Sequence, residues 1–262
     1  MKKNIHNKPL LTLVGAGPGD PELISIKGYK ALKNAKVVLY DALIHPDILN
    51  YIPEDAVKIH VGKRCGHHSF RQKQINKLIV KYALEYGEVV RLKGGDPFIF
   101  GRGREEIDYA ANFGIDSAVI PGLSSATSLP ALQGISLTQR KVNESFWVIT
   151  GSTSARELSK DLRLAAQSSA TVVVLMGRNK LQEISDLYSE FGKQDLPVAV
   201  IQNGSLETEK VVLGKVKNIA ALAEEKNVGT PALIVLGEVV ARHANYLPQY
   251  IEQELALEFN KN

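Results

Sequence analysis

The sequence predicts an α/β protein made of two α/β domains. Short apolar segments typical of strands recur along the chain and alternate with segments of helical periodicity, which is the pattern of β-α-β units. Several of the apolar segments end in glycine or in a polar loop, as strands do where an α/β sheet binds its ligand. With 262 residues, of which 44% are hydrophobic, the chain is long enough to form two domains with separate cores.

Composition narrows the classes of function. The single cysteine, Cys65, excludes an internal disulfide framework and a multi-cysteine metal cluster, and it fits a reducing, cytoplasmic compartment. The net charge of +4 favours anionic ligands only weakly, because the basic residues are dispersed, so we expect no nucleic-acid partner. The apolar runs are too short to span a bilayer, and residues 1–8 lack the following hydrophobic region of a signal peptide, so we expect no membrane association.

The first domain is predicted over residues 1–122. Its strands are expected at residues 10–14, 37–41, 57–61 and 117–120 and at the start of the segment 89–103, and its helices at residues 23–34, 75–83 and 102–112. Asp20 followed by Pro21 is typical of a helix N-cap with proline at the first helical position. Five strands alternating with helices predict one doubly wound sheet.

The segment 89–103 is the centre of this domain. A strand-like run meets two adjacent glycines, Gly94 and Gly95, which allow a sharp turn and close approach of a ligand to the backbone. Pro97 biases Asp96 towards extended geometry, so the carboxylate is held on a stiff turn. Taken alone, this motif fits two structures equally well: a loop that binds a ligand, or a tight strand-to-helix connection that binds none. In the following helix, the acids Glu105 and Glu106 fall in the first turn, where the helix dipole favours them.

Two further strand ends carry polar residues. Asp41 follows the second predicted strand, where parallel sheets gather their chemistry, although capping of the next turn is the alternative. Lys63 and Arg64 follow the third strand and suit an anionic ligand. The adjacent histidines, His67 and His68, have no ligand partners at a metal-binding spacing, so we expect no metal site.

The second domain is predicted over residues 123–245. Its strands are expected at residues 146–151, 171–176, 197–201, 211–213 and 232–237, and its helices at residues 181–191 and 219–225. Residues 124–128 predict a helix start with polar groups available to a ligand. Residues 134–145 lack periodicity and predict a functional loop or a bridge between domains, and residues 246–262 predict a surface helix at the end of the chain.

In combination, the motifs resemble those of the tetrapyrrole methylase family. The resemblance runs from about residue 11 to about residue 240, and it rests most on the segment 90–103 together with the first glycine loop. The sequence departs from the family pattern at Arg104, Ser125 and Gln139, where glycine, alanine and histidine are common. The matching segments are residues 15–23, 38–41, 61–64, 90–103, 121–122 and 137–140.

The resemblance implies a homodimer that binds S-adenosylmethionine in a cleft between the domains and releases S-adenosylhomocysteine. It implies methyl transfer to carbon atoms of a small-molecule tetrapyrrole, for sirohaem or cobalamin synthesis. Asp41 and Lys63 match the proposed proton acceptor and donor, and a substrate with many carboxylates suits Arg64, Arg102 and Arg140. The positions that match cofactor contacts are Pro18, Gly94, Gly95, Asp96, Ile99, Ser124, Ser125, Met176, Gly204 and Ala232.

Three alternatives stay open. A later precorrin could be the methyl acceptor. A dinucleotide-dependent oxidoreductase is suggested by Gly15 and Gly17 after a strand, with Asp41 at the spacing of a ribose-binding acid, but Asp20 occupies the third fingerprint position and would repel a pyrophosphate. A regulatory module would bind S-adenosylmethionine without turnover.

Overall fold

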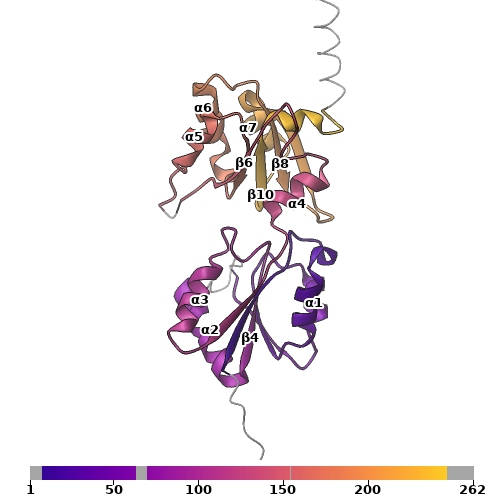
Figure 1. Cartoon of the computed structure of the whole chain (residues 1–262). Coiled ribbons are helices and arrows are strands. Elements are labelled where there is room, and N and C mark those ends of the chain that lie inside the picture. Colours follow the sequence, from indigo (N-terminus) through magenta and orange to yellow (C-terminus); the bar gives the residue numbers. More distant parts are fainter. Residues whose placement is uncertain (1–7, 63–69, 154, 247–262) are drawn as a thin grey trace, which may run out of the picture. The chain divides into compact units, whose positions relative to one another are not determined.

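The computed structural model describes residues 8–62, 70–153 and 155–246. The chain divides into two compact units, Met1–Ser124 and Ser125–Asn262, whereas the sequence placed the boundary after residue 122. Each unit is an α/β body with its own sheet (Figure 1). The expected cleft between the units stays a prediction.

Unit 1 contains one parallel sheet, in the strand order β3-β2-β4-β1-β5. Strand β4 lies at its centre, so the segment that we singled out in the sequence occupies the middle of the sheet. The strands are β1 (Leu10–Gly15), β2 (Val37–Tyr40), β3 (Val57–His60), β4 (Glu88–Lys93) and β5 (Asp116–Ile120). Its α-helices are α1 (Ile26–Lys33), α2 (Gln72–Tyr86) and α3 (Gly103–Ala111).

Helices cover both faces of this sheet, as expected for a doubly wound domain. Helices α2 and α3 lie on one face and α1 on the other (Figure 1). Strand β1 shows the reason, because Leu11 and Leu13 pack in the core under α2 and α3, whereas Val14 packs in the core on the α1 face. Side chains alternate between faces along a strand, so an apolar strand can serve both cores.

Two connections differ from the predicted pattern. The helix expected at residues 23–34 is divided into a 3₁₀ turn, η1 (Pro21–Leu23), and α1, which begins after the N-cap Ser25. Asp20 caps η1, because its Oδ1 accepts from the backbone N–H of Glu22 at 2.8 Å. Strands β2 and β3 are joined by another 3₁₀ segment, η2 (Pro46–Tyr51), in place of an α-helix.

Unit 2 contains a mixed sheet in the order β6-β7-β10-β8-β9. Strands β6 and β7 are parallel, and the other pairings are antiparallel. The strands are β6 (Phe146–Thr150), β7 (Thr171–Leu175), β8 (Pro197–Gln202), β9 (Lys210–Lys215) and β10 (Ala232–Leu236). The helices are α4 (Ser125–Leu132), α5 (Asp161–Gln167), α6 (Leu181–Glu190) and α7 (Val216–Glu225), with 3₁₀ segments η3 (Arg178–Lys180) and η4 (Glu238–Arg242).

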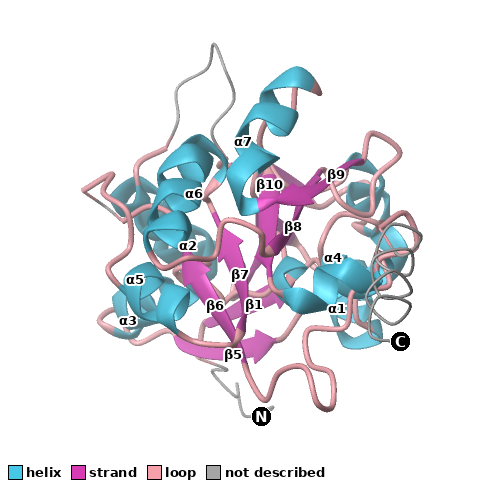
Figure 2. Cartoon of the chain, turned by 90° about the horizontal axis from the view of Figure 1, so that it is seen from above, coloured by secondary structure: helices cyan, strands magenta, loops and turns pink. Residues whose placement is uncertain are grey.

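The second sheet also has a core on each face. Side chains from α5, α6 and α7 form one core, and α4 packs on the opposite face with Val239 and Val240 of η4 (Figure 2). Helix α5 was absent from the sequence prediction, because it is only seven residues long and gives a weak periodic signal. The expected helix at residues 246–262 lies almost wholly outside the described residues.

Candidate functional site

Three loops of unit 1 meet where β1, β4 and β5 end. Gly17 and Gly95 exchange two backbone hydrogen bonds, from Gly95 N to Gly17 O at 2.7 Å and from Gly17 N to Gly95 O at 3.3 Å. A Cβ atom on Gly122 would lie 2.3 Å from the carbonyl oxygen of Gly95, and one on Gly15 would lie 2.5 Å from Gly122 N. Only glycine permits backbones to pack this closely, so the contact depends on the residue type at each position.

The two adjacent glycines after β4 have different constraints. Gly95 has a φ of +65°, in the left-handed region that glycine adopts without a steric penalty. At Gly94 an added Cβ would lie 3.1 Å from Cβ of Leu43, in the loop after β2. The loop after β4 therefore fits tightly between its neighbours and presents backbone with few side-chain atoms in the way.

Asp96 has a structural role that the sequence did not indicate. Its Oδ1 accepts from the backbone N–H of Phe98 at 2.8 Å, and its Oδ2 accepts from that of Gly122 at 3.1 Å. The carboxylate therefore connects the loop after β4 to the loop after β5. Each carboxylate oxygen can accept a second bond, so a cofactor contact at Asp96 stays a prediction beside this role.

The segment after Asp96 exposes apolar side chains in a strained turn. Phe98, Ile99 and Phe100 have exposed fractions of 48%, 44% and 46%. Phe100 and Arg102 both adopt positive φ angles, of 53° and 61°, which are uncommon for residues with a side chain. Such outliers cluster at functional sites, where surrounding contacts enforce them.

Arg102, which we expected to bind substrate, is paired within its own helix start. Its Nε and Nη2 donate to the two carboxylate oxygens of Glu105 at 2.8 and 2.6 Å. This hydrogen bonding to Glu105 raises the pKa of Arg102. The pair is about half exposed, so solvent screens it and a substrate carboxylate can compete for the guanidinium.

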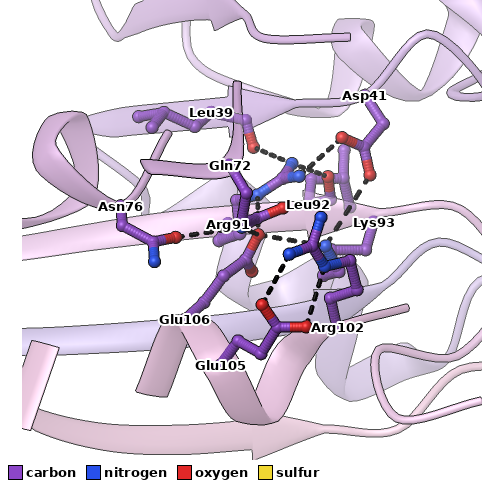
Figure 3. Close-up of polar contacts among 10 residues, drawn as sticks. All are labelled: Leu39, Asp41, Gln72, Asn76, Arg91, Leu92, Lys93, Arg102, Glu105 and Glu106. Atoms are coloured by element: carbon purple, nitrogen blue, oxygen red, sulfur yellow. Dashed lines mark hydrogen bonds and ion pairs between the residues drawn. The ribbon is translucent and has the colours of Figure 1, made fainter. Parts of the chain in front are cut away.

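An ionic cluster, mostly buried, lies where β2 and β4 end (Figure 3). Arg91 Nη2 donates to Oδ1 of Asp41 at 2.5 Å, and Arg91 Nε donates to Oε1 of Glu106 at 3.2 Å. Lys93 Nζ lies 3.2 Å from the same Glu106 oxygen and 4.0 Å from Oδ2 of Asp41. Two cations and two carboxylates thus form a compact group, which we call the charge cluster: Asp41, Arg91, Lys93 and Glu106.

The alternation of side chains along β4 explains this arrangement. Val89, Arg91 and Lys93 share one face of the strand, and Val89 packs in the core beneath α2 and α3. The charged side chains on that face therefore point towards α3, which supplies Glu106. The predicted position of Glu106 in the first turn of α3 is confirmed, and the structure adds that its side chain is fully buried beside two cations.

Burial controls the electrostatics of the cluster. Burial opposes the charge on Arg91, but the carboxylates of Glu106 and Asp41 outweigh it and raise the pKa of Arg91. For Lys93 the balance is reversed, because burial and the neighbouring Arg91 charge lower its pKa. The sequence carried a signal for this cluster: two cations at alternate positions of a central strand require buried acidic partners.

Several predicted site residues of unit 1 lie near these loops. Pro18 follows Gly17, which is bonded to Gly95, and Ser124 lies two residues after Gly122. Asp41 follows β2, which pairs with β4 through Tyr40 and Leu92, so Asp41 lies beside the end of β4. Lys63 and Arg64 are outside the described residues, as are Cys65, His67 and His68.

Three predicted cofactor positions of unit 2, Met176, Gly204 and Ala232, lie at one end of its sheet. Strand β10 begins at Ala232, which is in register with Gln202 of β8, while Leu233 is in register with Leu175 of β7. Met176 and Gly204 therefore follow strand ends that flank Ala232. Met176 has a φ of 55° and is 55% exposed.

Two glycine contacts support the loops at this end of unit 2. A Cβ atom on Gly204 would lie 2.6 Å from the side chain of Leu129 in α4, the helix that begins at Ser125. A Cβ atom on Gly151 would lie 2.3 Å from Cα of Gly177, so the loops after β6 and β7 also pack backbone to backbone. Arg140 is exposed on the segment between α4 and β6.

The described residues contain neither a membrane-spanning helix nor a cluster of metal ligands. No helix within them is both long enough and apolar enough to cross a bilayer. They also contain no group of three or more His, Cys, Asp or Glu side chains placed to hold a metal ion.

Comparison with known proteins identifies relatives along nearly the whole chain. The sequence model of the family of tetrapyrrole (corrin/porphyrin) methylases matches residues 10–220. A uroporphyrinogen-III C-methyltransferase of Methanocaldococcus jannaschii is 47% identical over 230 residues, which cover 87% of this chain and 95% of that protein. A sirohaem synthase of Actinobacillus pleuropneumoniae is 44% identical, and the match covers 90% of this chain and 49% of that protein.

A solved structure gives the same result for the fold. Uroporphyrin-III C-methyltransferase from Thermus thermophilus, in complex with S-adenosylhomocysteine, matches with a TM-score of 0.75 and 38% sequence identity. The match covers 88% of this chain and 98% of that one. It confirms the two-sheet α/β fold that the sequence predicted.

Proposed function

The chain belongs to the tetrapyrrole methylase family, and from that premise we propose that it is an S-adenosylmethionine-dependent methyltransferase acting on uroporphyrinogen III. The observation that carries this proposal is the 47% identity to a uroporphyrinogen-III C-methyltransferase across 95% of that relative. The product is precorrin-2, made by way of precorrin-1 through methylation at C2 and C7. The relative from Thermus thermophilus, whose structure contains S-adenosylhomocysteine, supports the cofactor.

The loops of unit 1 fit such a cofactor. Gly94 and Gly95 expose backbone next to a strand end, where N–H and C=O groups can contact a polar ligand at short range. Ile99 adds an exposed apolar side chain on the same loop. In unit 2, Met176 presents a further exposed apolar side chain beside Ala232. These positions, with Pro18, Asp96, Ser124, Ser125 and Gly204, form the proposed cofactor set.

The chemistry asks little of the protein beyond alignment and proton transfer. When bound, S-adenosylmethionine supplies an electrophilic methyl group, which an electron-rich pyrrole carbon of the substrate can attack directly. The protein must hold the carbon in line with that methyl group, since orientation accounts for a large part of such barriers. Asp41 accepts the proton that the ring then loses, and it is suited to this because a quarter of its side chain, 27%, is exposed at a strand end.

Substrate charge suits the basic residues. Uroporphyrinogen III carries eight carboxylates, and arginine pairs with carboxylates in a bidentate geometry. Arg102 and Arg140 are both exposed and belong to the proposed substrate set. Arg64 and Lys63 belong to the same proposal on sequence grounds, with Lys63 as proton donor.

The proposal is tested with methyl-labelled S-adenosylmethionine and enzymatically prepared uroporphyrinogen III. We expect two methyl groups on one tetrapyrrole by mass spectrometry, and carbon NMR should place them at C2 and C7. Methylation of a later precorrin but not of uroporphyrinogen III would identify a different substrate. Calorimetric binding of NADPH without binding of S-adenosylmethionine would contradict the proposal altogether.

Assembly, location and pathway are part of the same proposal. We propose a homodimer, tested by light scattering of the purified chain, and a cytoplasmic location, tested by cell fractionation. The match to the sirohaem synthase covers about half of that relative, and we propose that the product serves sirohaem or cobalamin synthesis.

A further inference from the structure

Besides Asp41, the proposed proton acceptor, the charge cluster contains three charged side chains to which no function has yet been assigned. Asp41 is the member with substantial solvent exposure, because the side chains of Arg91, Lys93 and Glu106 are 5% exposed or less. Burying three charged side chains next to one partly exposed carboxylate is costly. Such burial is typical of charged residues with a functional role, and the contacts of Arg91, Lys93 and Glu106 indicate which role they have.

Arg91 binds the Asp41 carboxylate with a guanidinium that is itself fixed on several sides. Its Nη2 donates to Oδ1 of Asp41, and its Nη1 donates to the carbonyl oxygens of Leu92 at 3.0 Å and Leu39 at 3.4 Å. Its Nε donates to Glu106. A planar guanidinium held at three edges leaves the Asp41 carboxylate little freedom to rotate.

Glu106 holds both cations at a single oxygen. Its Oε1 accepts from Arg91 Nε at 3.2 Å, from Lys93 Nζ at 3.2 Å and from Nε2 of Gln72 at 3.1 Å. Its Oε2 has no hydrogen-bond partner among the described residues. Glu106 does not contact Asp41, so any effect on that carboxylate passes through Arg91 and Lys93.

We propose that Arg91, held in place by Glu106, is a positioning residue that orients the Asp41 carboxylate for proton transfer. Arg91 occupies Oδ1, so Oδ2 is the oxygen that receives the proton. Lys93, 4.0 Å from Oδ2, balances the charge on that side without a direct hydrogen bond. This inference rests on the proposed methyltransferase function and on Asp41 as its proton acceptor.

The first test separates positioning from folding by comparing conservative variants of the full chain. Arg91→Lys keeps the positive charge but cannot contact Asp41, Glu106 and two carbonyls together, and Glu106→Gln keeps the shape but loses the charge. Each should lower kcat about 10- to 100-fold, as small misplacements of reacting groups do. Affinity for S-adenosylhomocysteine, measured by calorimetry, should change less than about twofold, since neither side chain belongs to the cofactor loops.

Two control variants define what a merely structural role would look like. Asp108→Asn makes the same acid-to-amide change on α3, at an exposed residue paired with the exposed Arg104. Ala110→Gly weakens the buried face of α3 without touching a charge. Both should keep the wild-type kcat per folded molecule, with the folded fraction counted by S-adenosylhomocysteine binding.

A double-mutant cycle provides the decisive measurement. In an Asp41→Asn background, adding Arg91→Lys should lower kcat by less than about a further twofold. The reason is that Arg91 affects turnover through the Asp41 carboxylate, which this background already lacks. Multiplicative losses, or an unchanged kcat in Arg91→Lys alone, would overturn the positioning role while leaving the methyltransferase function intact. An inactive wild-type chain would instead contradict the function itself.

Discussion

Arg91 and Asp41 are 50 positions apart in the sequence, and their side chains meet in a 2.5 Å hydrogen bond. The contact exists because β2 and β4 are neighbours in the parallel sheet, with Tyr40 in register with Leu92. A strand end that carries the proposed proton acceptor is thereby fastened to the central strand of unit 1.

Asp41→Asn should lower the rate of methyl transfer. The amide cannot accept the proton, and general acid-base assistance typically contributes about 10²- to 10⁴-fold in rate. Single-turnover assays scored for mono- and dimethylated product should show the loss in both steps, with little change in cofactor Kd. If Asp41 only capped the turn after β2, the variant would lose stability and keep its turnover per folded molecule.

Glu106→Leu should destabilise unit 1 strongly. The change leaves Arg91 and Lys93 buried with one carboxylate between them, and removing one partner of a buried ion pair costs about 3–5 kcal/mol. Urea unfolding followed by circular dichroism measures the loss. Asp108→Leu on the same helix is the matched control, because its carboxylate is exposed and its loss should matter far less. Equal losses in the two variants would contradict the energetic importance of the cluster.

Gly122→Ala should disrupt the contact among the three loops. The new Cβ would lie 2.3 Å from the carbonyl oxygen of Gly95, too close for any real contact, so the backbone must move. We expect a stability loss of about 1–3 kcal/mol, typical of overpacking, and weaker cofactor binding. Gly229→Ala is the control, because its added Cβ would meet only the amide of Gln202, at an ordinary 3.4 Å. Unchanged affinity in Gly122→Ala would separate this contact from the cofactor site.

Arg102→Ala and Arg140→Ala should raise KM for the porphyrinogen and leave cofactor affinity unchanged. Both side chains are exposed, so the attraction should weaken with added salt, which screens charges over about 10 Å at 0.1 M. Arg104→Ala removes another exposed arginine, in α3, and should leave KM unchanged. KM values that are independent of salt in the wild type and both variants would remove these arginines from the substrate set.

Tyr188→Phe should stabilise unit 2, increasingly so at high pH. The Tyr188 hydroxyl is buried without a hydrogen-bond partner among the described residues, and removing such a group can be neutral or stabilising by about 1 kcal/mol. Burial raises the pKa of Tyr188, so the folded state resists ionisation. Above pH of about 10 the unfolded tyrosine ionises, and the wild type should lose up to about 1.4 kcal/mol per pH unit that the variant keeps.

Thermal unfolding of both proteins between pH 8 and pH 11 measures this difference. The gap in stability between wild type and Tyr188→Phe should be constant up to about pH 10 and widen above it. A gap that stays constant throughout would show that the hydroxyl ionises as readily in the folded state as in the unfolded one.

Sequence alone determined the strands and the glycine loops of this protein. Apolar runs such as Leu10–Gly15 and Ala232–Leu236 are strands because alternating burial on both faces requires them to be apolar throughout. Gly94 and Gly95 were identifiable because no other residue suits a turn with close backbone contacts. The strands and glycine loops depend on residues close together in the sequence, so they can be predicted from the sequence itself.

Only the tertiary structure decided which charged side chains contact one another. Arg91 and Lys93 appeared in the sequence as parts of a strand, and Glu106 as a residue in the first turn of a helix, 13 positions beyond Lys93. Only the packing of α3 on one face of β4, and of β2 beside it, brings Asp41, Arg91, Lys93 and Glu106 together. Asp96 likewise needed the loop after β5 before its bond to Gly122 could form. Long-range contacts follow from strand order and side-chain direction, which local residue patterns do not specify.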